Sequence, residues 1–151
     1  MKNIKINLQI ATENKSIPHK KDFINWLTAA AKIVPPPKNK DEINIRLIDE
    51  PESATLNKNY RNIDKPTNIL SFAYQPDIND DNLLGDLAIC APIVEQEAQQ
   101  QQKSSLAHWA HIVIHGYLHL LGLEHQNAEE AKKMEQLEIE ILRKLRYPSP
   151  Y

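Results

Sequence analysis

Apolar and polar residues alternate over short stretches of this chain, a pattern typical of strands that bury one face. Residues 5–11 alternate near the N-terminus, and Ile43, Ile45 and Leu47 repeat the pattern further along. From the alternation and from the turns between the segments, we predict strands over residues 5–11, 43–47, 68–72 and 83–90.

Other stretches repeat their apolar residues at the spacing of a helix. The first begins near Asp22 and must end before Pro35, because proline has no backbone N–H and disfavours helical geometry in the residue before it. Its expected inward residues are Phe23, Trp26, Leu27, Ala30 and Ala31. Further helices are predicted over residues 51–61, from Pro92 through the glutamine run 99–102, from Ser104 or Ser105 to Gly122, and over about 128–145.

The other helices have expected inward faces too. In the helix over 51–61 we expect Ala54, Leu56 and Tyr60 to point inward. The last helix carries an apolar stripe made by Met134, Leu137, Ile141 and Leu145.

The arrangement of these elements predicts the fold class. Four strands and about five helices predict a single α+β domain over residues 1–151, with the helices packed on a small mixed sheet. The early strand–helix–strand order favours at least one parallel pair, whereas the strand order stays open.

The composition agrees with a folded domain and limits its surroundings. The 151 residues are 41% hydrophobic and 25% charged, which is ordinary for a globular protein. No apolar run reaches the roughly 18 residues of a membrane helix, and the N-terminus has no signal-peptide core. The single cysteine, Cys90, cannot form an internal disulfide and is expected to be a small buried residue, not a metal ligand. We therefore expect a cytoplasmic protein with no membrane association.

Charge is unevenly distributed along the chain. The net charge of −2 neither identifies nor excludes a nucleic-acid-binding protein, because binding depends on where the charges lie. Residues 74–82, with Asp77, Asp80 and Asp81, are predicted to form an exposed acidic loop.

Five of the six histidines lie between His108 and His125. His115 and His119 are four residues apart, so a helix places both imidazoles within reach of one ion. Gly122 permits a sharp exit from the helix, because glycine tolerates a positive φ, and His125 can then return toward the pair. This spacing matches the ligand skeleton of the metzincin zinc peptidases. Three histidines also leave a fourth position open, as in catalytic zinc sites, so we predict one zinc ion on His115, His119 and His125.

The two remaining histidines of this segment fall outside the triplet. His111 forms an i, i+4 pair with His115 but lacks the turn and the third ligand on the correct side. We assign His111 to support of the site or to packing, and His108 to the surface or to helix packing.

Gly116 argues against peptidase chemistry. In the peptidase motif the residue after the first histidine is a glutamate, which acts as the general base. Gly116 can transfer no proton. The sequence thus has the metal-binding residues of a zinc hydrolase but lacks the general base of a peptidase.

A second candidate site is the basic turn after the helix over 51–61. Lys58, Arg61 and Lys65 gather there against one acid, Asp64. Arginine is the side chain best shaped for bidentate contacts to phosphate. A solvated charged turn is the alternative.

Taken together, these segments resemble the YbeY family of bacterial endonucleases that mature ribosomal RNA. The matching pieces read YR at 60–61, DKPTNILSF at 64–72, LGDLAI at 84–89 and HGYLHLLGLEH at 115–125. The resemblance runs from about residue 45 to residue 145. Glu124 and Leu123 depart from the family pattern, which more often has aspartate and an aromatic residue there, although the carboxylate is kept.

The resemblance implies a single α+β domain that binds one zinc ion through His115, His119 and His125 and cleaves single-stranded RNA. The implied role is maturation of the 3′ end of 16S ribosomal RNA and ribosome quality control. The implied partners are precursor 16S ribosomal RNA, the small ribosomal subunit and its proteins, and an assembly GTPase.

The resemblance also suggests roles for individual residues. Arg61 matches the family arginine implicated in activity, and we take Arg61 and His115 as the catalytic residues. Lys58 and Lys65 join Arg61 as residues expected to bind the substrate. Asp86 and Ser71 are expected to contact protein partners.

Two questions stay open at this point. No side chain in the motif is an obvious general base, so a zinc-bound hydroxide and the RNA 2′-hydroxyl are both candidate nucleophiles. The alternatives to an endoribonuclease are a zinc-containing ribosome-assembly factor without catalysis and a zinc metallopeptidase, the latter opposed by Gly116.

Overall fold

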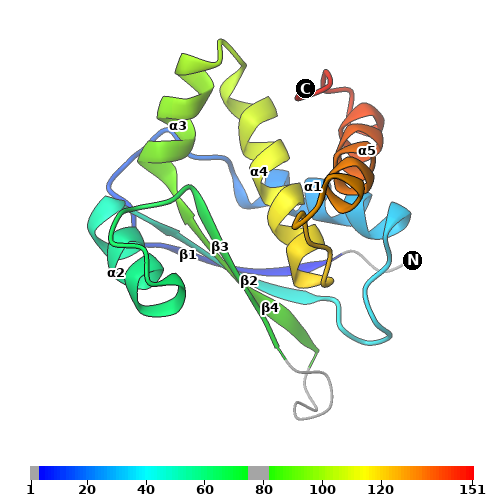
Figure 1. Cartoon of the computed structure of the whole chain (residues 1–151), viewed down its shortest axis with the longest axis horizontal. Helices are drawn as coiled ribbons and strands as arrows, with labels where there is room; N and C mark the ends of the chain where they lie inside the picture. The colour runs from blue at the N-terminus through cyan, green and yellow to red at the C-terminus, as the bar shows by residue number, and fades with distance from the viewer. Residues whose placement is uncertain (1–3, 75–81) are drawn as a thin grey trace.

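The computed structural model describes residues 4–74 and 82–151. In chain order, its elements are β1 (Lys5–Ile10), α1 (Lys20–Ile33), β2 (Glu42–Ile48), α2 (Glu50–Arg61), β3 (Ile69–Ala73), β4 (Leu83–Cys90), α3 (Ala91–Gln100), α4 (Ser105–Leu120) and α5 (Ala128–Lys144) (Figure 1). The predicted α+β class is confirmed. The predicted acidic residues Asp77, Asp80 and Asp81 lie outside the described residues.

The strands form one mixed sheet in the order β1-β2-β4-β3. β1 pairs with β2, and β2 with β4, in parallel, whereas β3 runs antiparallel to β4. The predicted parallel pairing is therefore confirmed, and β3 lies at an edge of the sheet.

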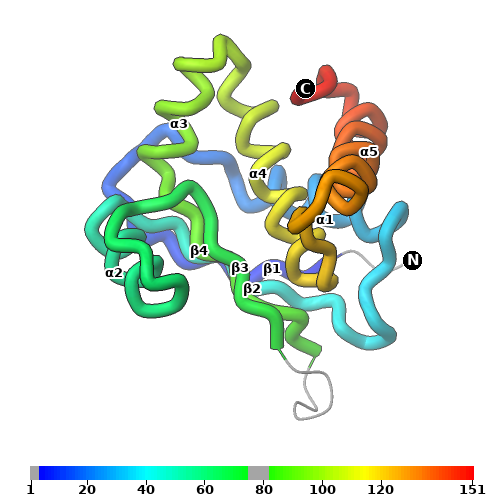
Figure 2. The backbone as a smooth tube through the Cα atoms, viewed as in Figure 1, coloured from blue at the N-terminus to red at the C-terminus, as the bar shows by residue number. Residues whose placement is uncertain are grey.

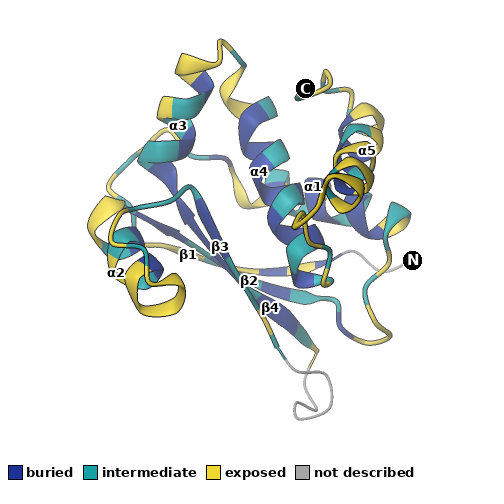
Figure 3. Cartoon of the chain, viewed as in Figure 1, coloured by how far each residue is buried: buried dark blue, intermediate teal, exposed yellow. Residues whose placement is uncertain are grey.

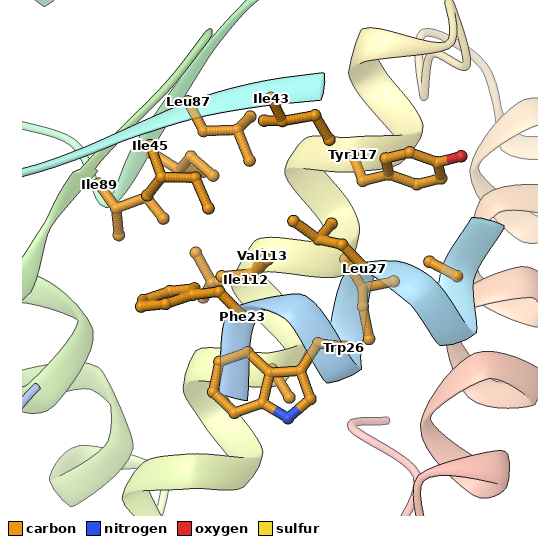
Figure 4. Packing of buried hydrophobic residues seen from close by; sticks show 14 of the residues in the cluster. Phe23, Trp26, Leu27, Ile43, Ile45, Leu87, Ile89, Ile112, Val113 and Tyr117 are labelled. Atoms are coloured by element: carbon orange, nitrogen blue, oxygen red, sulfur yellow. The ribbon is translucent and has the colours of Figure 1, made fainter. Parts of the chain in front are cut away.

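The larger core lies between one face of the sheet and helices α1 and α4. Ile45 and Leu87 from the sheet face Phe23 and Leu27 of α1 and Val113 of α4 (Figure 4). The inward residues predicted for the first helix are all buried. α4 is buried along most of its length, whereas α5 exposes its outer side (Figure 3).

A smaller core occupies the other face of the sheet. Leu70, Ala88 and Cys90 alternate with residues of the larger core, because successive strand residues point to opposite faces. Leu56 of α2 packs on them and is partly buried. The prediction that Tyr60 faces inward is wrong, since its side chain is 66% exposed.

The buried side of α2 is polar because it holds the following loop. Ser53 Oγ donates to the Thr67 carbonyl oxygen and accepts from the Thr67 N–H, both at 2.9 Å. Asn57 Nδ2 donates to the carbonyl oxygen of Lys65 at 2.8 Å. These bonds replace the apolar contacts that we expected at Tyr60, and they fix the turn that follows Arg61.

Two glycines let α4 approach the β3–β4 edge closely. A Cβ at Gly116 of α4 would lie 2.5 Å from Ile69 Cδ1 of β3, and one at Gly85 of β4 would lie 2.7 Å from Leu120 Cδ2 of α4. Ser71 Oγ donates to the Gly116 carbonyl oxygen at 3.3 Å. The residues on α4 next to Gly116 are therefore held beside β3. Across residues 4–74 and 82–151, none of the helices has the length and apolar character to cross a bilayer.

Candidate functional site

Three histidine side chains converge at the C-terminal end of α4. His115 and His119 lie one turn apart, and their Nε2 atoms are 3.0 Å apart. The helix ends at Leu120, and Gly122, with a φ of +88°, turns the chain so that His125 returns to the pair. The ligand atoms of the three histidines all lie within 4.8 Å of one another. The structure thus brings together the three residues that the sequence predicted as ligands.

The spacing of these nitrogens fits a single metal ion. Zinc–nitrogen bonds of about 2 Å in tetrahedral geometry place ligand nitrogens about 3.3 Å apart. The 3.0 Å between His115 and His119 is close to that value. His125 is exposed, so a small side-chain rotation can close the remaining distance. Three imidazole donors with an open side are a set that suits zinc.

Burial lowers the pKa of His119, and the neighbouring His115 lowers it further, while Glu124 acts in the opposite direction. The Glu124 carboxylate lies 4.0 Å from His119 Nδ1. A lowered pKa favours the neutral imidazole, which is the form that binds a metal.

Glu138 of α5 supports this site from inside the protein. Its carboxylate is fully buried, and its Oε2 atom lies 2.5 Å from His115 Nδ1. The other oxygen accepts hydrogen bonds from His111 Nε2, at 2.9 Å, and from the Tyr151 hydroxyl. A carboxylate can only accept, so His115 carries its proton on Nδ1 and presents the Nε2 lone pair to the other two histidines.

The ionisation of Glu138 is set by these partners. Burial raises the pKa of the carboxyl group, but the hydrogen bonds from His111, His115 and Tyr151 together outweigh it and lower the pKa to about 2. Glu138 is therefore a carboxylate at neutral pH.

The C-terminal segment completes the surroundings of Glu138. It turns back from α5 toward α4 (Figure 2), and the Pro150 carbonyl oxygen accepts a hydrogen bond from Lys103 Nζ at 3.0 Å. The Tyr151 ring packs edge-on against His111, with ring centroids 5.5 Å apart. Partial burial of the Tyr151 hydroxyl raises its pKa, and the contact with the Glu138 carboxylate raises it further, although most of the residue is exposed.

Sequence reasoning missed Glu138 and Tyr151, although one signal was present. Glu138 occupies an inward position of α5, four residues after Met134 and three before Ile141, both of which are buried. A charged residue at such a position requires partners. The histidines of the preceding helix, His111 among them, were the obvious candidates.

The two histidines outside the triplet are both held by glutamates. His111 contacts Glu138 and so supports the site, in line with one of its two predicted roles. His108 is packed inside the protein, 3% exposed, with Nε2 at 3.0 Å from Glu97 Oε1. Burial raises the pKa of Glu97, but hydrogen bonds from His108 and Asn68 lower it further than burial raises it.

One cleft of about 1180 Å³ contains the three histidines and Arg61. β3 and α4 line it and run in the same direction. Asn68, before β3, donates to Glu97, which pairs with His108 near the start of α4, and Ser71 of β3 donates to Gly116 farther along α4. Arg61, at the end of α2, is exposed and has no ion-pair partner among the residues that the structure describes. Asn62 ends α2 in the left-handed conformation, with a φ of 57°, and turns the chain toward β3.

The other predicted binding residues lie elsewhere. Lys58 and Lys65 are exposed and do not line the cleft. Ser71 lines it, but Asp86 is paired in register with Phe72 and therefore points to the opposite face of the sheet from Ser71. There Asp86 accepts hydrogen bonds from Asn44 Nδ2 and the Tyr74 hydroxyl, both at 2.9 Å. The two predicted partner contacts are thus on different surfaces.

Cys90 lies apart from the histidines, in the smaller core. It is fully buried, and burial raises the pKa of its thiol.

Comparison with known proteins identifies the family. The sequence model of the family described as Endoribonuclease YbeY matches residues 6–146. The solution structure of TM1509 from Thermotoga maritima is 27% identical in sequence, with a TM-score of 0.56, and the match covers 93% of this chain and 92% of that one. The family match spans nearly the whole chain, including the histidine triplet, Arg61 and the strands between them. The chain therefore belongs to the YbeY endoribonuclease family.

Proposed function

We propose that this chain is a zinc-dependent endoribonuclease that cleaves single-stranded RNA. Its substrate in this proposal is precursor 16S ribosomal RNA, and its role is maturation of the 3′ end and ribosome quality control, which take place in the cytoplasm. The observation that carries the proposal is one cleft in which three convergent histidines face the same space as Arg61, an arginine with no ion-pair partner among the described residues.

The three histidines and the glutamate behind them have separate tasks in this proposal. His115, His119 and His125 hold the ion, and Glu138 keeps His115 in the tautomer that can bind it. When bound, zinc polarises a phosphoryl oxygen and lowers the pKa of water.

Arg61 binds the phosphate that is cleaved. Because no described carboxylate competes for its guanidinium, both of its edges are free for a bidentate contact. The contact strengthens as negative charge grows on the phosphate oxygens, so it stabilises the transition state more than the ground state. Lys58 and Lys65, outside the cleft, bind flanking phosphates and make affinity fall with salt.

The partners in this proposal are the small ribosomal subunit and its proteins, and an assembly GTPase. Asp86 and Ser71 are the residues we assign to such contacts. They lie on different faces of the sheet, so the proposal needs either two contact surfaces or two partners.

Peptidase activity is disfavoured by packing as well as by chemistry. A Cβ at position 116 would meet Ile69 Cδ1 at 2.5 Å and Leu87 Cδ2 at 3.0 Å. A glutamate there would have to push aside the ends of the Ile69 and Leu87 side chains, so packing adds to the chemical argument against a peptidase base at this position.

The decisive experiment compares metal-free and zinc-restored protein on single-stranded RNA and on a duplex of the same sequence. We expect cleavage of the single strand only, regained with zinc, and absent from His119→Ala. Cleavage that survives complete removal of metal would overturn the proposal. Binding to precursor ribosomal particles without cleavage would instead favour an assembly factor whose metal is structural.

A further inference from the structure

The large apolar side chains exposed in the described part of the chain include two aromatic residues, Tyr60 and Tyr151. They are 66% and 61% exposed, and both line the cleft of the three histidines. Tyr151 is engaged by Glu138 and His111, as described above. Among the residues that the structure describes, the hydroxyl of Tyr60 has no such partner, and no contact within α2 explains why the ring is exposed in the cleft.

The Tyr60 ring is supported from one side. It lies against the ring of Phe72, with centroids 4.8 Å apart and planes inclined by 59°. Phe72, a residue of β3, packs on the smaller core, as does Leu56 of α2. One side of the aromatic pair Tyr60–Phe72 thus rests against the core, while most of Tyr60 is exposed to solvent.

The aromatic pair stands next to the groups of the proposed reaction. Arg61 follows Tyr60 in the chain. Ser71, which donates to the Gly116 carbonyl oxygen beside His115, and Phe72 point to opposite faces of the edge strand β3, so a cleft that both residues line extends around this edge of the sheet. All of these residues line the same cleft. A phosphate held by Arg61 would therefore have the base of an adjoining nucleotide within reach of the aromatic pair.

We propose that the Tyr60–Phe72 pair is a base-stacking subsite for a nucleotide next to the cleaved phosphodiester. This inference rests on the proposed function, that RNA occupies the cleft. Every base has a π-face, so stacking on tyrosine tolerates any sequence. It needs a base that is out of its own helical stack, so the subsite selects single-stranded RNA over a duplex. The subsite adds a discrimination that neither the histidines nor Arg61 can supply, because phosphates are present in both forms.

The test measures binding of a single-stranded 2′-O-methyl oligouridylate of about eight nucleotides to the full-length protein by fluorescence anisotropy. Gel analysis after each titration verifies that the probe is intact. Tyr60→Ala should weaken binding about 5- to 150-fold, the range for loss of one base–aromatic stack. Tyr60→Phe keeps the ring and should bind within about twofold of the wild type. Leu106→Ala, which removes an exposed apolar side chain outside the cleft, is the matched control and should have no effect.

A set of probes in which one base at a time is removed locates the contact. For the probe that lacks the stacked base, wild type and Tyr60→Ala should bind equally, because neither protein can then form the stacking contact. A duplex probe should also not distinguish the two proteins. Tyr60→Leu serves as the second variant if Tyr60→Ala does not fold, as judged by its thermal melting curve.

The outcomes separate this inference from the function on which it rests. If the wild type binds the single strand and Tyr60→Ala binds it equally well, the stacking subsite is refuted while the function stands. If the wild type binds no single-stranded RNA, both the proposed function and the subsite fail.

Discussion

Replacing Glu138 by glutamine should weaken metal binding without unfolding the protein. In the wild type, one carboxylate oxygen faces His115 Nδ1, and the other accepts from His111 and Tyr151. A glutamine has one acceptor oxygen and one donor NH₂ in the same space. It cannot accept on both sides, so either His115 or the His111–Tyr151 pair loses its acceptor.

The magnitude follows from which side is lost. If the NH₂ group faces His115, the imidazole must carry its proton on Nε2, the atom that points at the other histidines, and the ligand is disabled in that state. If the oxygen faces His115, the ligand is kept but its partner is uncharged and weaker. Loss of such an outer carboxylate typically costs 10- to 100-fold in metal affinity, about 1.4–2.8 kcal/mol.

The assay is competition for zinc against a chromophoric chelator, at fixed pH and in parallel with a melting curve. Glu140→Gln is the matched control, because Glu140 is exposed on the same helix and the change of charge is identical. Tyr151→Phe removes one hydrogen bond to Glu138 and should give a smaller loss, within about tenfold. A Glu138→Gln protein that stays folded and binds zinc as tightly as Glu140→Gln would show that the carboxylate does not orient His115.

Four further predictions test other parts of the molecule. His119→Ala should lose the single equivalent of zinc expected for the wild type, because two histidines cannot hold a tetrahedral ion tightly; elemental analysis of the purified variant decides this. Cys90→Ala should keep its zinc, since the thiol is buried in the smaller core, and loss of metal from a folded variant would contradict the ligand assignment. Arg61→Ala should leave zinc content and melting temperature nearly unchanged, because an exposed arginine contributes little to stability, while RNA cleavage falls about 10- to 1000-fold and Arg61→Lys recovers only part of it. Unfolding of Arg61→Ala would instead make it a structural residue. Folding lowers the pKa of Glu97, so its carboxylate stabilises the folded protein at pH values above its ordinary pKa of 4.5. This stabilisation is lost as the pH falls below 4.5 and the carboxylate becomes protonated. Denaturant titrations from pH 6 to about pH 3 should therefore show a shallower loss of stability for Glu97→Gln than for the wild type.

The elements with a strong periodic pattern were the ones predicted well. The inward residues of α1 and the range of β4 agree with the structure, because apolar spacing reports directly on burial. The convergence of His115, His119 and His125 was predicted equally well, since it depends on one helix turn and one glycine, both local features.

The parts that were missed depend on contacts distant in sequence. The order β1-β2-β4-β3 is set by how the helices pack on the sheet, and strand patterns alone do not encode it. Tyr60 was misplaced because the inward side of α2 is held by Ser53 and Asn57, whose hydrogen bonds to the next loop leave no apolar signal. Glu138 and Tyr151 reach the histidines only after α5 packs on α4.

Gly116 links the fold of this protein to its chemistry. Its missing side chain allows α4 to lie against Ile69 and Leu87, and this close contact holds His115 beside β3 and the Arg61 end of the cleft. The same missing side chain removes the proton acceptor that a peptidase carries at this position. A glutamate at this position would have to push aside the Ile69 and Leu87 side chains that pack against α4. Close helix packing and the absence of a peptidase base therefore both follow from Gly116, and our proposed function assigns phosphate recognition by Arg61 to this cleft instead.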